Sequence, residues 1–275
     1  MKLLIIGGSG FLGAELIRQA VAGGHTTAAT YATRPGSASE VDWYPLDLRS
    51  TRDVEAVMAD VGPHLVVNAS SGGADWAVTA EGPLRLAIAT AKYGCRLVHV
   101  SSDAVFSGTR VHYDEPCLPD PVTPYGAAKA AAETGIRLTH PDAVIARTSL
   151  IIGDRQSTHE RMVHDLAADT RSGVLFTDDI RCPVHVADLA AALLELACGE
   201  ANGVHHVAGA DAVSRHELGI LIAKRDGLDA SRLPAGLRAD SELPGALDVR
   251  LDSRTTQRKL HTTLRGARQF LALGA

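Results

Sequence analysis

A glycine-rich stretch near the beginning of the chain constrains the fold more than any other part of the sequence. It lies directly after the apolar run 3–6 and directly before 14–21, where apolar residues recur at helical spacing. A strand, a tight glycine turn and a helix in this order are typical of a dinucleotide site. The backbone can approach a pyrophosphate there, and the helix N-terminus stabilises its charge. A glycine-rich turn in an ordinary α/β protein is the alternative, which the flanking elements disfavour. The residues expected at the cofactor are Gly7, Ser9, Gly10, Phe11, Leu12 and Gly13.

Length and composition are typical of a globular enzyme. With 275 residues, of which 45% are hydrophobic, the chain can bury one core with or without a smaller lobe. The net charge of −5 and the lack of a long basic run argue against a nucleic-acid partner. The first apolar run is too short for a signal peptide, and no run approaches membrane-spanning length, so we expect no membrane partner. The four cysteines form no C-x-x-C pair, which favours a reducing compartment, and we expect a cytoplasmic protein.

Strands and helices alternate through the first half of the chain. Alternation of this kind predicts an α/β fold with a Rossmann-type doubly wound parallel sheet, covered by helices on both faces. Beyond Arg147 the pattern is less regular, which predicts a small C-terminal substrate lobe. The strands expected are 2–6, 26–30, 42–45, 64–68, 96–101, 143–147 and 204–207, and the clearest helices are 51–60, 82–93 and 186–198. We assign 1–150, with a returning segment near 184–208, to the cofactor domain, and 151–183 with 209–275 to the lobe.

Tyr125 and Lys129 are the second informative feature. Helical residues four apart share a face, so a helix that begins near Pro124 places the phenol and the ammonium side by side. A free phenol has a pKa of about 10, and an adjacent ammonium lowers it. With a hydroxyl nearby, Tyr125 can pass a proton to a carbonyl oxygen as hydride reaches its carbon. A surface Tyr and Lys on a helix is the alternative, and the pair alone is a weak signal.

Ser101, Ser102 and Asp103 end one of the expected strands. Ligands of open parallel sheets lie beyond the carboxyl ends of the strands, so either serine can donate a hydrogen bond to the same carbonyl oxygen. A simple Ser-Asp turn is the alternative.

Together these motifs resemble the extended short-chain dehydrogenases/reductases, and among them the dTDP-4-dehydrorhamnose reductase-like subgroup. The resemblance covers nearly the whole chain, and the ordered set is much more specific than any single motif. The matching positions are 7–13, 47–48, 68–69, 101–103, 105–108, 113–115, 124–126, Lys129, Glu133, 147–149, 178–183 and 251–253.

The resemblance implies a role for particular residues. It makes Tyr125 and Lys129 the catalytic pair and Ser102 their hydroxyl partner. It also places Asp47 and Leu48 at the adenine of the cofactor. The remaining residues expected along the cofactor are Asn68, Ala69, Ser70, Ser101, Tyr125 and Lys129.

The chain departs from the subgroup at positions that contact the sugar. Where the subgroup often has an aromatic residue after Ser-Thr-Asp and after Arg-Thr-Ser, this chain has Ala104 and Leu150. Where the subgroup usually has an asparagine, this chain has Thr79. The Arg-Pro pair that is common in the subgroup before Leu251 is not evident here. The catalytic set is therefore retained while the sugar contacts are altered, and rhamnose formation becomes a weaker expectation than reduction of some keto group.

The cofactor is expected to be NADPH, with NAD as the alternative. A site for NAD usually has an acidic residue about 20 positions beyond the glycines. The chain has no acid in that region, and Thr33 and Arg34 can meet a 2′-phosphate instead. A solvated loop arginine is the alternative role for Arg34.

The function expected is NADPH-dependent reduction of a keto group, on a nucleotide-activated sugar or a related small molecule. The alternatives are a sugar-nucleotide epimerase or dehydratase, and a non-catalytic NADP-binding regulatory protein like the methionine adenosyltransferase regulatory subunit of this subgroup. A homodimer is one possible assembly. The residues expected at the substrate are Ser70, Ser71, Ser102, Phe106, Tyr125, Ser149, Leu150, Arg181 and His185.

Two histidine patterns suggest a metal but are better explained otherwise. His159 and His164 are five apart, so on a helix they point about 140° apart. His205 and His206 are neighbours in an expected strand and point to opposite faces. We therefore expect no metal site.

Overall fold

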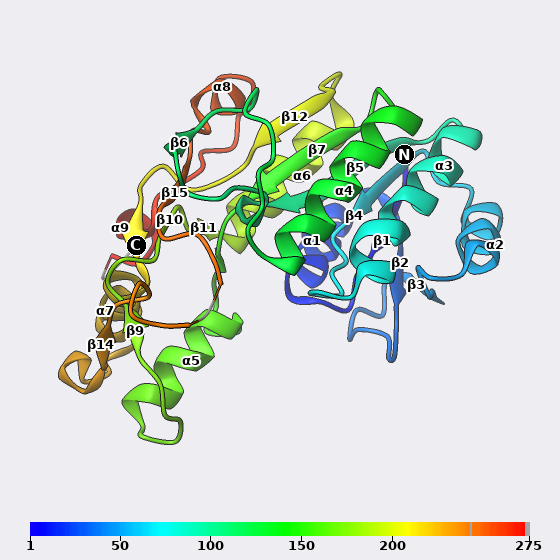
Figure 1. Cartoon of the computed structure of the whole chain (residues 1–275). Helices are drawn as coiled ribbons and strands as arrows, with labels where there is room; N and C mark the ends of the chain where they lie inside the picture. The colour runs from blue at the N-terminus through cyan, green and yellow to red at the C-terminus, as the bar shows by residue number, and fades with distance from the viewer. Residues whose placement is uncertain (243, 273–275) are drawn as a thin grey trace.

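The computed structural model describes residues 1–242 and 244–272. Its centre is a seven-stranded sheet in the order β12-β7-β5-β4-β1-β2-β3, in which every pairing is parallel (Figure 1). The predicted doubly wound parallel sheet is confirmed, and the strands begin and end close to the predicted positions. They are β1 (Lys2–Ile6), β2 (Thr26–Tyr31), β3 (Asp42–Pro45), β4 (Leu65–Asn68), β5 (Arg96–Ser102), β7 (Val144–Thr148) and β12 (Gly203–His206).

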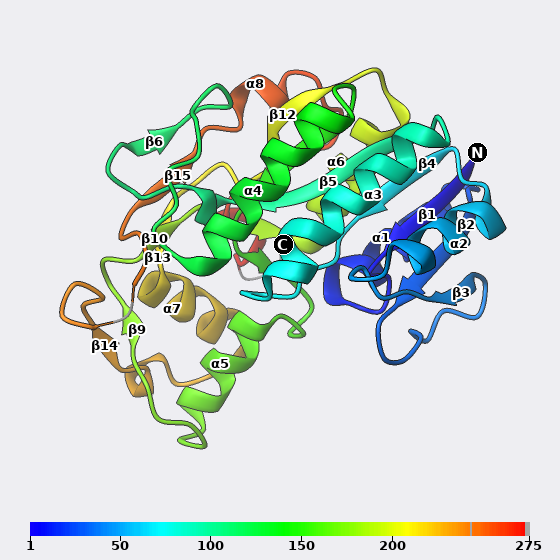
Figure 2. The same cartoon turned by 45° about the vertical axis from the view of Figure 1, so that its right-hand side comes forward.

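Helices cover both faces of this sheet, and β1 shows why the strands are apolar throughout. Leu3 and Ile5 pack into the core cluster beneath α1 (Phe11–Ala22) and α6 (Val186–Cys198). Leu4 and Ile6 pack into the opposite cluster, beneath α2 (Thr51–Val61), α3 (Gly82–Lys92) and α4 (Pro124–Thr139). Because successive side chains of a strand point to opposite faces, a strand buried on both faces must be apolar at every position. Figure 2 shows α3 and α4 side by side on one face.

Caps fix the helices that shape the site. The Oγ atom of Ser50 accepts a hydrogen bond from the backbone of Asp53 at the start of α2, and Gly62 ends that helix with a φ of 56°. Thr123 caps α4 in the same way, and Pro124 occupies its first turn. These are the positions where side-chain oxygens and left-handed glycines stabilise helix ends.

Most of the chain beyond β7, apart from α6 and β12, builds a smaller body beside the sheet, at the lower left of Figure 1, which we call the C-terminal lobe. Its helices α5 (Thr158–Ala167) and α7 (Arg215–Asp226) pack around a separate apolar cluster that includes Val163, Leu218 and Phe270. The sheet domain and lobe boundaries given above remain a proposal. The other elements are β6 (Val111–Tyr113), β8 (Ile151–Ile152), β9 (Leu175–Phe176), β10 (Ile180–Arg181), β11 (Val184–His185), β13 (Val213–Ser214), β14 (Ala235–Gly236), β15 (Val249–Leu251), α8 (Arg254–Gln257), α9 (Ala267–Phe270), the π-helical turn η1 (Ala77–Glu81), and the 3₁₀ turns η2 (Asp103–Val105) and η3 (Ala230–Arg232).

Asp226 ties α7 to α5. Its side chain is buried, and its oxygens accept hydrogen bonds from Arg155, His164 and Arg225. Burial opposes ionisation of this carboxyl, but the three donors outweigh it and hold the pKa of Asp226 well below its usual range. The lobe is thus stabilised by a charged cluster as well as by its apolar core.

Within the described part of the chain, no helix has both the length and the apolar character needed to cross a membrane.

Candidate active site

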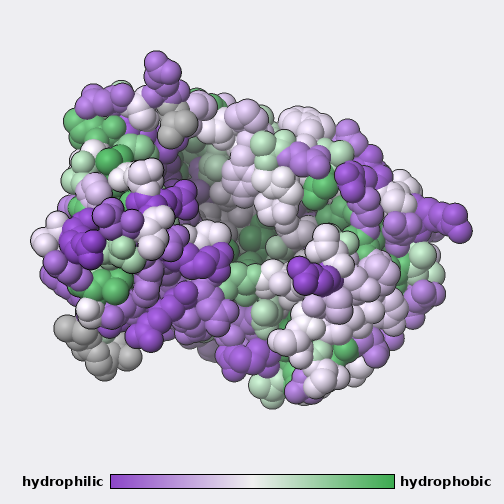
Figure 3. All heavy atoms as spheres, turned by 90° about the horizontal axis from the view of Figure 1, so that it is seen from below, coloured by the Kyte–Doolittle hydropathy of each residue, from purple (hydrophilic) through white to green (hydrophobic). Residues whose placement is uncertain are grey.

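A cavity of about 570 Å³ lies between the carboxyl ends of β5 and β7 and the C-terminal lobe. Figure 3 shows the molecule hollowed on this side, between its two masses. Of the residues expected at the substrate, the cavity wall contains Ser102, Phe106, Tyr125, Ser149, Leu150 and Arg181. Phe11 of the glycine loop reaches the same wall, so the cofactor loop borders the substrate cavity.

Tyr125 lies in the first turn of α4, which packs closely against η2. A Cβ atom on Gly126 would overlap the carbonyl oxygen of Ala104, so only glycine permits this approach. Tyr125 consequently lines the same cavity as Ser102. Burial raises the pKa of Tyr125, while hydrogen bonds with Ser102 and Ser71 work in the opposite direction. The structure thus brings together the predicted proton donor and its predicted hydroxyl partner.

Lys129 lies one turn further along α4, with only 3% of its surface exposed. Its Nζ atom donates a hydrogen bond to the backbone oxygen of Val100, at 2.9 Å. The sequence predicted the Lys129 ammonium beside the Tyr125 phenol, whereas the hydrogen bond of this ammonium is to the backbone of β5. Burial, only partly offset by the charge of Glu133, lowers the pKa of Lys129 to about 8.

The two serines at the end of β5 have different partners. The Oγ atom of Ser102 accepts a hydrogen bond from the backbone of Ala104 and donates one to Asp103. The Oγ atom of Ser101 is buried and donates to Glu133 at 2.6 Å. Ser102 therefore borders the cavity, while the side chain of Ser101, expected at the cofactor, points to the interior instead.

A second cavity, of about 380 Å³, lies where the glycine loop meets the ends of β2, β3 and β4. It contains half of the residues expected at the cofactor, namely Gly7, Ser9, Gly10, Thr33, Asp47, Leu48, Ala69 and Ser70. Ser71 lines this cavity as well. Gly10 lines the second cavity and the next residue, Phe11, lines the first, so the two cavities are neighbours along the glycine loop.

The glycine loop is shaped for close approach of a ligand. Gly7 has a φ of 79°, and a Cβ atom on it would lie 2.9 Å from the Cα atom of Ser70. A Cβ atom on Gly13 would overlap the carbonyl oxygen of Gly7, so Gly13 permits α1 to pack against the loop rather than touching a cofactor. Leu12 belongs to the core beneath α1. The loop lines the second cavity directly before the N-terminus of α1, a position that suits the pyrophosphate of a dinucleotide.

Asn68, expected along the cofactor, is fully buried and supports the site indirectly. Its Oδ1 atom accepts hydrogen bonds from the backbone and the hydroxyl of Ser70, at 3.1 and 2.6 Å. Its Nδ2 atom faces Nδ1 of His99 at 3.2 Å. Asn68 therefore fixes the loop that borders the cofactor cavity.

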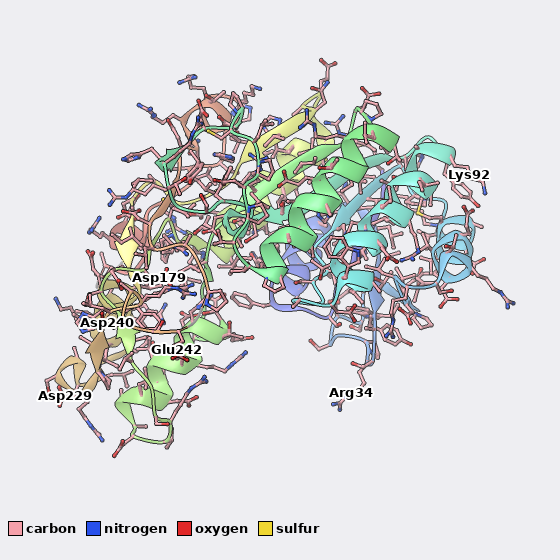
Figure 4. All side chains as sticks on the ribbon, in the orientation of Figure 1. Arg34, Lys92, Asp179, Asp229, Asp240 and Glu242 are labelled. Atoms are coloured by element: carbon pink, nitrogen blue, oxygen red, sulfur yellow. The ribbon has the colours of Figure 1, made fainter. Side chains whose placement is uncertain are left out.

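The two arginines near the cofactor cavity are placed differently. Arg34 is exposed on the loop after β2 and extends away from the body of the protein in Figure 4. Arg49 lines the cavity and binds both oxygens of Asp47. Hydrogen bonds from Arg49 lower the pKa of Asp47. Sequence reasoning missed Arg49, although its position two residues after Asp47 in the same loop was a usable signal.

An arginine cluster surrounds one carboxylate in the wall of the first cavity. Asp179, labelled in Figure 4, is 1% exposed and lies 2.9 Å from Arg181, 3.4 Å from Arg215 and 3.1 Å from Arg238. The guanidinium of Arg181 also donates to the backbone oxygens of residues 180, 246 and 247, so its role is largely structural. Arg215, Arg238, Arg161 and His159 also line the cavity and were not predicted, since they come from distant segments without a common motif.

The remaining residues expected at the substrate differ in their placement. Phe106 is 1% exposed because its ring stacks on Tyr113, with centroids 4.1 Å apart, so only its edge meets the cavity. His185 caps α6 through a hydrogen bond from Ala187 and is outside the described wall of the cavity. Its ring packs near Phe270 instead.

The histidine pairs have separate partners. On α5, His159 faces Arg215 while His164 binds Asp226. Burial lowers the pKa of His159 to about 4, so it is neutral. His205 lies near Thr256, and His206 packs edge-on to Phe106. In residues 1–242 and 244–272, no group of three or more His, Cys, Asp or Glu side chains is placed to hold a metal ion.

Comparisons with known proteins agree with the fold. Residues 1–271 match the model of a family described as the RmlD substrate binding domain. A Haloferax volcanii protein named "Probable low-salt glycan biosynthesis reductase Agl14" is 28% identical over 90% of this chain and 87% of its own. The dTDP-4-dehydrorhamnose reductase of Mycobacterium tuberculosis is 31% identical over 84% of this chain and 78% of its own. The crystal structure of the Bacillus anthracis dTDP-4-dehydrorhamnose reductase in complex with NADP shares the fold, with a TM-score of 0.81 and 22% identity, over 98% of this chain and 96% of the other.

Proposed function

The chain belongs to the RmlD substrate binding domain family, and from this premise we propose that it is an NADPH-dependent reductase of a keto group on a nucleotide-activated sugar. Two relatives with reductase names, together with a fold neighbour crystallised with NADP, support an oxidoreductase that uses this cofactor. The observation that carries the proposal is that two cavities adjoin at the glycine loop. One is lined by Tyr125 and Ser102, and the other by the loop itself together with residues expected at the cofactor.

The residues of the chain divide the chemistry among them. Bound NADPH supplies the hydride. Tyr125 holds a proton at its hydroxyl oxygen, because burial keeps the phenol neutral at physiological pH, and donates it to the carbonyl oxygen of the substrate. Ser102 hydrogen-bonds the same oxygen and orients the phenol. Lys129 provides positive charge beneath the site, which favours the phenolate that remains after proton transfer.

The charge of the first cavity favours an anionic substrate. Its wall carries Arg161, Arg181, Arg215 and Arg238 against the two carboxylates Asp103 and Asp179. Guanidinium groups bind phosphate oxygens through paired hydrogen bonds. A diphosphate between the sugar and its nucleoside would place two negative charges against this excess of arginine.

The deciding experiment is a screen of keto-bearing nucleotide sugars for NADPH oxidation, with Tyr125→Phe as the control. Turnover by the wild type and its loss in the variant would support the proposal. If NADPH binds but no such sugar oxidises it, the regulatory alternative is favoured. The lack of aromatic rings at Ala104 and Leu150 in the cavity wall would suit a protein that does not bind a sugar. Tightly bound cofactor that is recycled without net oxidation would favour the epimerase or dehydratase alternative.

The cytoplasmic location and the homodimer stay predictions.

A further inference from the structure

Behind the candidate catalytic residues lies a buried charged network that the chemistry above does not use. Glu133 is one helical turn beyond Lys129 on α4, and 2% of its surface is exposed. Its carboxylate accepts hydrogen bonds from Nε and Nη2 of Arg147 on β7, at 3.0 and 2.7 Å. The Oγ atom of Ser101 on β5 donates to the same carboxylate. Both oxygens of Glu133 are thus held in place by two neighbouring strands.

Arg147 is itself fixed on the side away from Glu133. Its Nη1 atom donates to the backbone oxygen of Cys117 at 3.0 Å, and its guanidinium lies 4.9 Å from the centre of the Phe106 ring. The other face of that ring stacks on Tyr113. A buried arginine and glutamate with this many partners are costly to separate and hold a single geometry. The position of the Glu133 charge relative to α4 is therefore rigid.

The negative charge that favours the ammonium form of Lys129 comes from Glu133, one helical turn away on α4. From β5, His99 faces the ammonium, but burial lowers the pKa of His99 well below its usual value and keeps it neutral. From β7, Arg147 forms an ion pair with Glu133 and so weakens, without abolishing, the effect of this carboxylate on Lys129. Of the elements that pack on α4, η2 carries Asp103, whose partners are Ser149 and Arg181, and η1 and α3 carry Glu81 and Arg85, which pair with each other. On α4 itself, Tyr125 is neutral.

We propose that Glu133 is a positioning residue that keeps the Lys129 ammonium charged, with Arg147 and Ser101 holding its carboxylate in place. A buried ammonium without a nearby carboxylate tends to lose its proton. The charge beneath Tyr125 thus depends on an ion pair that touches neither cavity. This inference rests on the proposed role of Lys129 in catalysis, but it can be tested without any substrate.

The test follows the titration of the lysine side chains by NMR, in protein labelled with ¹³C at the lysine ε-carbons. The resonance of Lys129 is assigned by its loss in Lys129→Met, and the exposed Lys92 is an internal reference. In the wild type, Lys129 should titrate with a pKa of about 8. Glu133→Gln keeps the shape but removes the negative charge, and should lower the titration midpoint of Lys129 by about one unit or more. Arg147→Gln removes the opposing positive charge, and should raise it.

Matched variants separate a charge effect from a loss of folding. Glu160 is another fully buried glutamate, paired with Arg225 at 2.8 Å in the lobe, so Glu160→Gln should leave the Lys129 midpoint unchanged. Glu133→Asp retains the charge and should restore a midpoint close to that of the wild type. If Glu133→Gln does not fold, Arg147→Gln tests the inference instead. A rise in the Lys129 midpoint supports the inference, and a fall contradicts it.

An unchanged midpoint in folded Glu133→Gln, or shifts of the same sign in Glu133→Gln and Arg147→Gln, would overturn the inference. Because NMR needs no substrate, shifts of the expected signs in a protein without reductase activity would preserve the inference and reject only the proposed function. In an active protein, the pH at which kcat declines on the alkaline side should move to lower pH in Glu133→Gln. A purely structural role would lower kcat without moving that pH.

Discussion

Ser149 donates a hydrogen bond from Oγ to the Oδ2 atom of Asp103 at 2.7 Å, and so joins the chain after β7 to the chain after β5. The same Asp103 oxygen lies 3.7 Å from Arg181. Burial is the main cause of the raised pKa of Tyr125, and the charge of Asp103 adds to it. Asp103 is thus fixed where it favours a protonated phenol, the form needed for reduction of a carbonyl.

Tyr125→Phe should lower kcat by about a hundredfold or more, because it removes the proton donor while retaining the ring. NADPH affinity should stay within about twofold, since the glycine loop is untouched. Steady-state kinetics and fluorescence titration measure the two effects, and the exposed Tyr93 gives a control variant, Tyr93→Phe. Turnover near that of the wild type in Tyr125→Phe would exclude this residue as the acid.

The protein should bind NADPH more tightly than NADH, and Arg34→Ala should remove most of the difference. Arg34 is exposed, so its guanidinium can meet a 2′-phosphate. Arg49→Ala is the informative comparison, because Arg49 already lines the cofactor cavity but is bound by Asp47. Titration of each variant with both cofactors distinguishes them. Loss of the preference in Arg49→Ala alone would transfer the role to Arg49, and equal affinities in the wild type would contradict the choice of NADPH.

dTDP-4-dehydrorhamnose should be a poor substrate. Ala104 and Leu150 line the cavity where aromatic residues are common in this subgroup, so the flat apolar contact with a sugar ring is weakened. The measurement is NADPH consumption with this sugar nucleotide, compared with other keto compounds. A kcat/KM of about 10⁴ M⁻¹s⁻¹ or better would show that the two missing rings do not matter.

Asp226→Asn should lower the melting temperature at neutral pH by about 5 °C or more, since it removes the buried charge that accepts hydrogen bonds from Arg155, His164 and Arg225. The pKa of Asp226 is depressed in the folded state, so its contribution is fully present well above 3.8, the ordinary value, and is lost as the pH falls through and below it. Melting curves of the wild type and variant should therefore converge in acid. Asp142→Asn, at an exposed carboxylate in the turn between α4 and β7, is the control. A constant difference from neutral to acid pH would contradict this explanation.

Gly126→Ala should reduce kcat by about tenfold or more, because an added methyl group overlaps the Ala104 carbonyl and forces α4 away from η2. The matched control is Gly135→Ala on the same helix, where the added atom meets only the flexible side chain of Leu84, at 3.1 Å. Kinetics and thermal melting of both variants make the comparison. Equal effects of the two substitutions would show that the contact between α4 and η2 does not position Tyr125.

Local sequence patterns predicted the sheet well because each carries its own physical signal. The apolar β1, the Ser50 cap of α2 and the glycine turn before α1 are all specified by neighbouring residues. The site was predictable where a residue stands at the end of such an element, as Ser102 ends β5. Of the arginines around Asp179, Arg215 and Arg238 could not be predicted, because they reach it from separate segments. The partners of Lys129 and His185 likewise depend on tertiary packing rather than on spacing.

The apolar cluster of the lobe joins residues made far apart in time. Ile152 and Val163 are synthesised more than 100 residues before Phe270 and Leu271, which complete the same cluster. The glycine cradle, in contrast, is built from residues 7–13 and from the loop after β4, which all precede the residues of the lobe cluster in the chain. Domains generally begin to fold while the chain emerges. A nascent chain can therefore form the cofactor cradle well before its substrate wall exists, and cofactor bound at that stage would stabilise the sheet while the lobe is still incomplete.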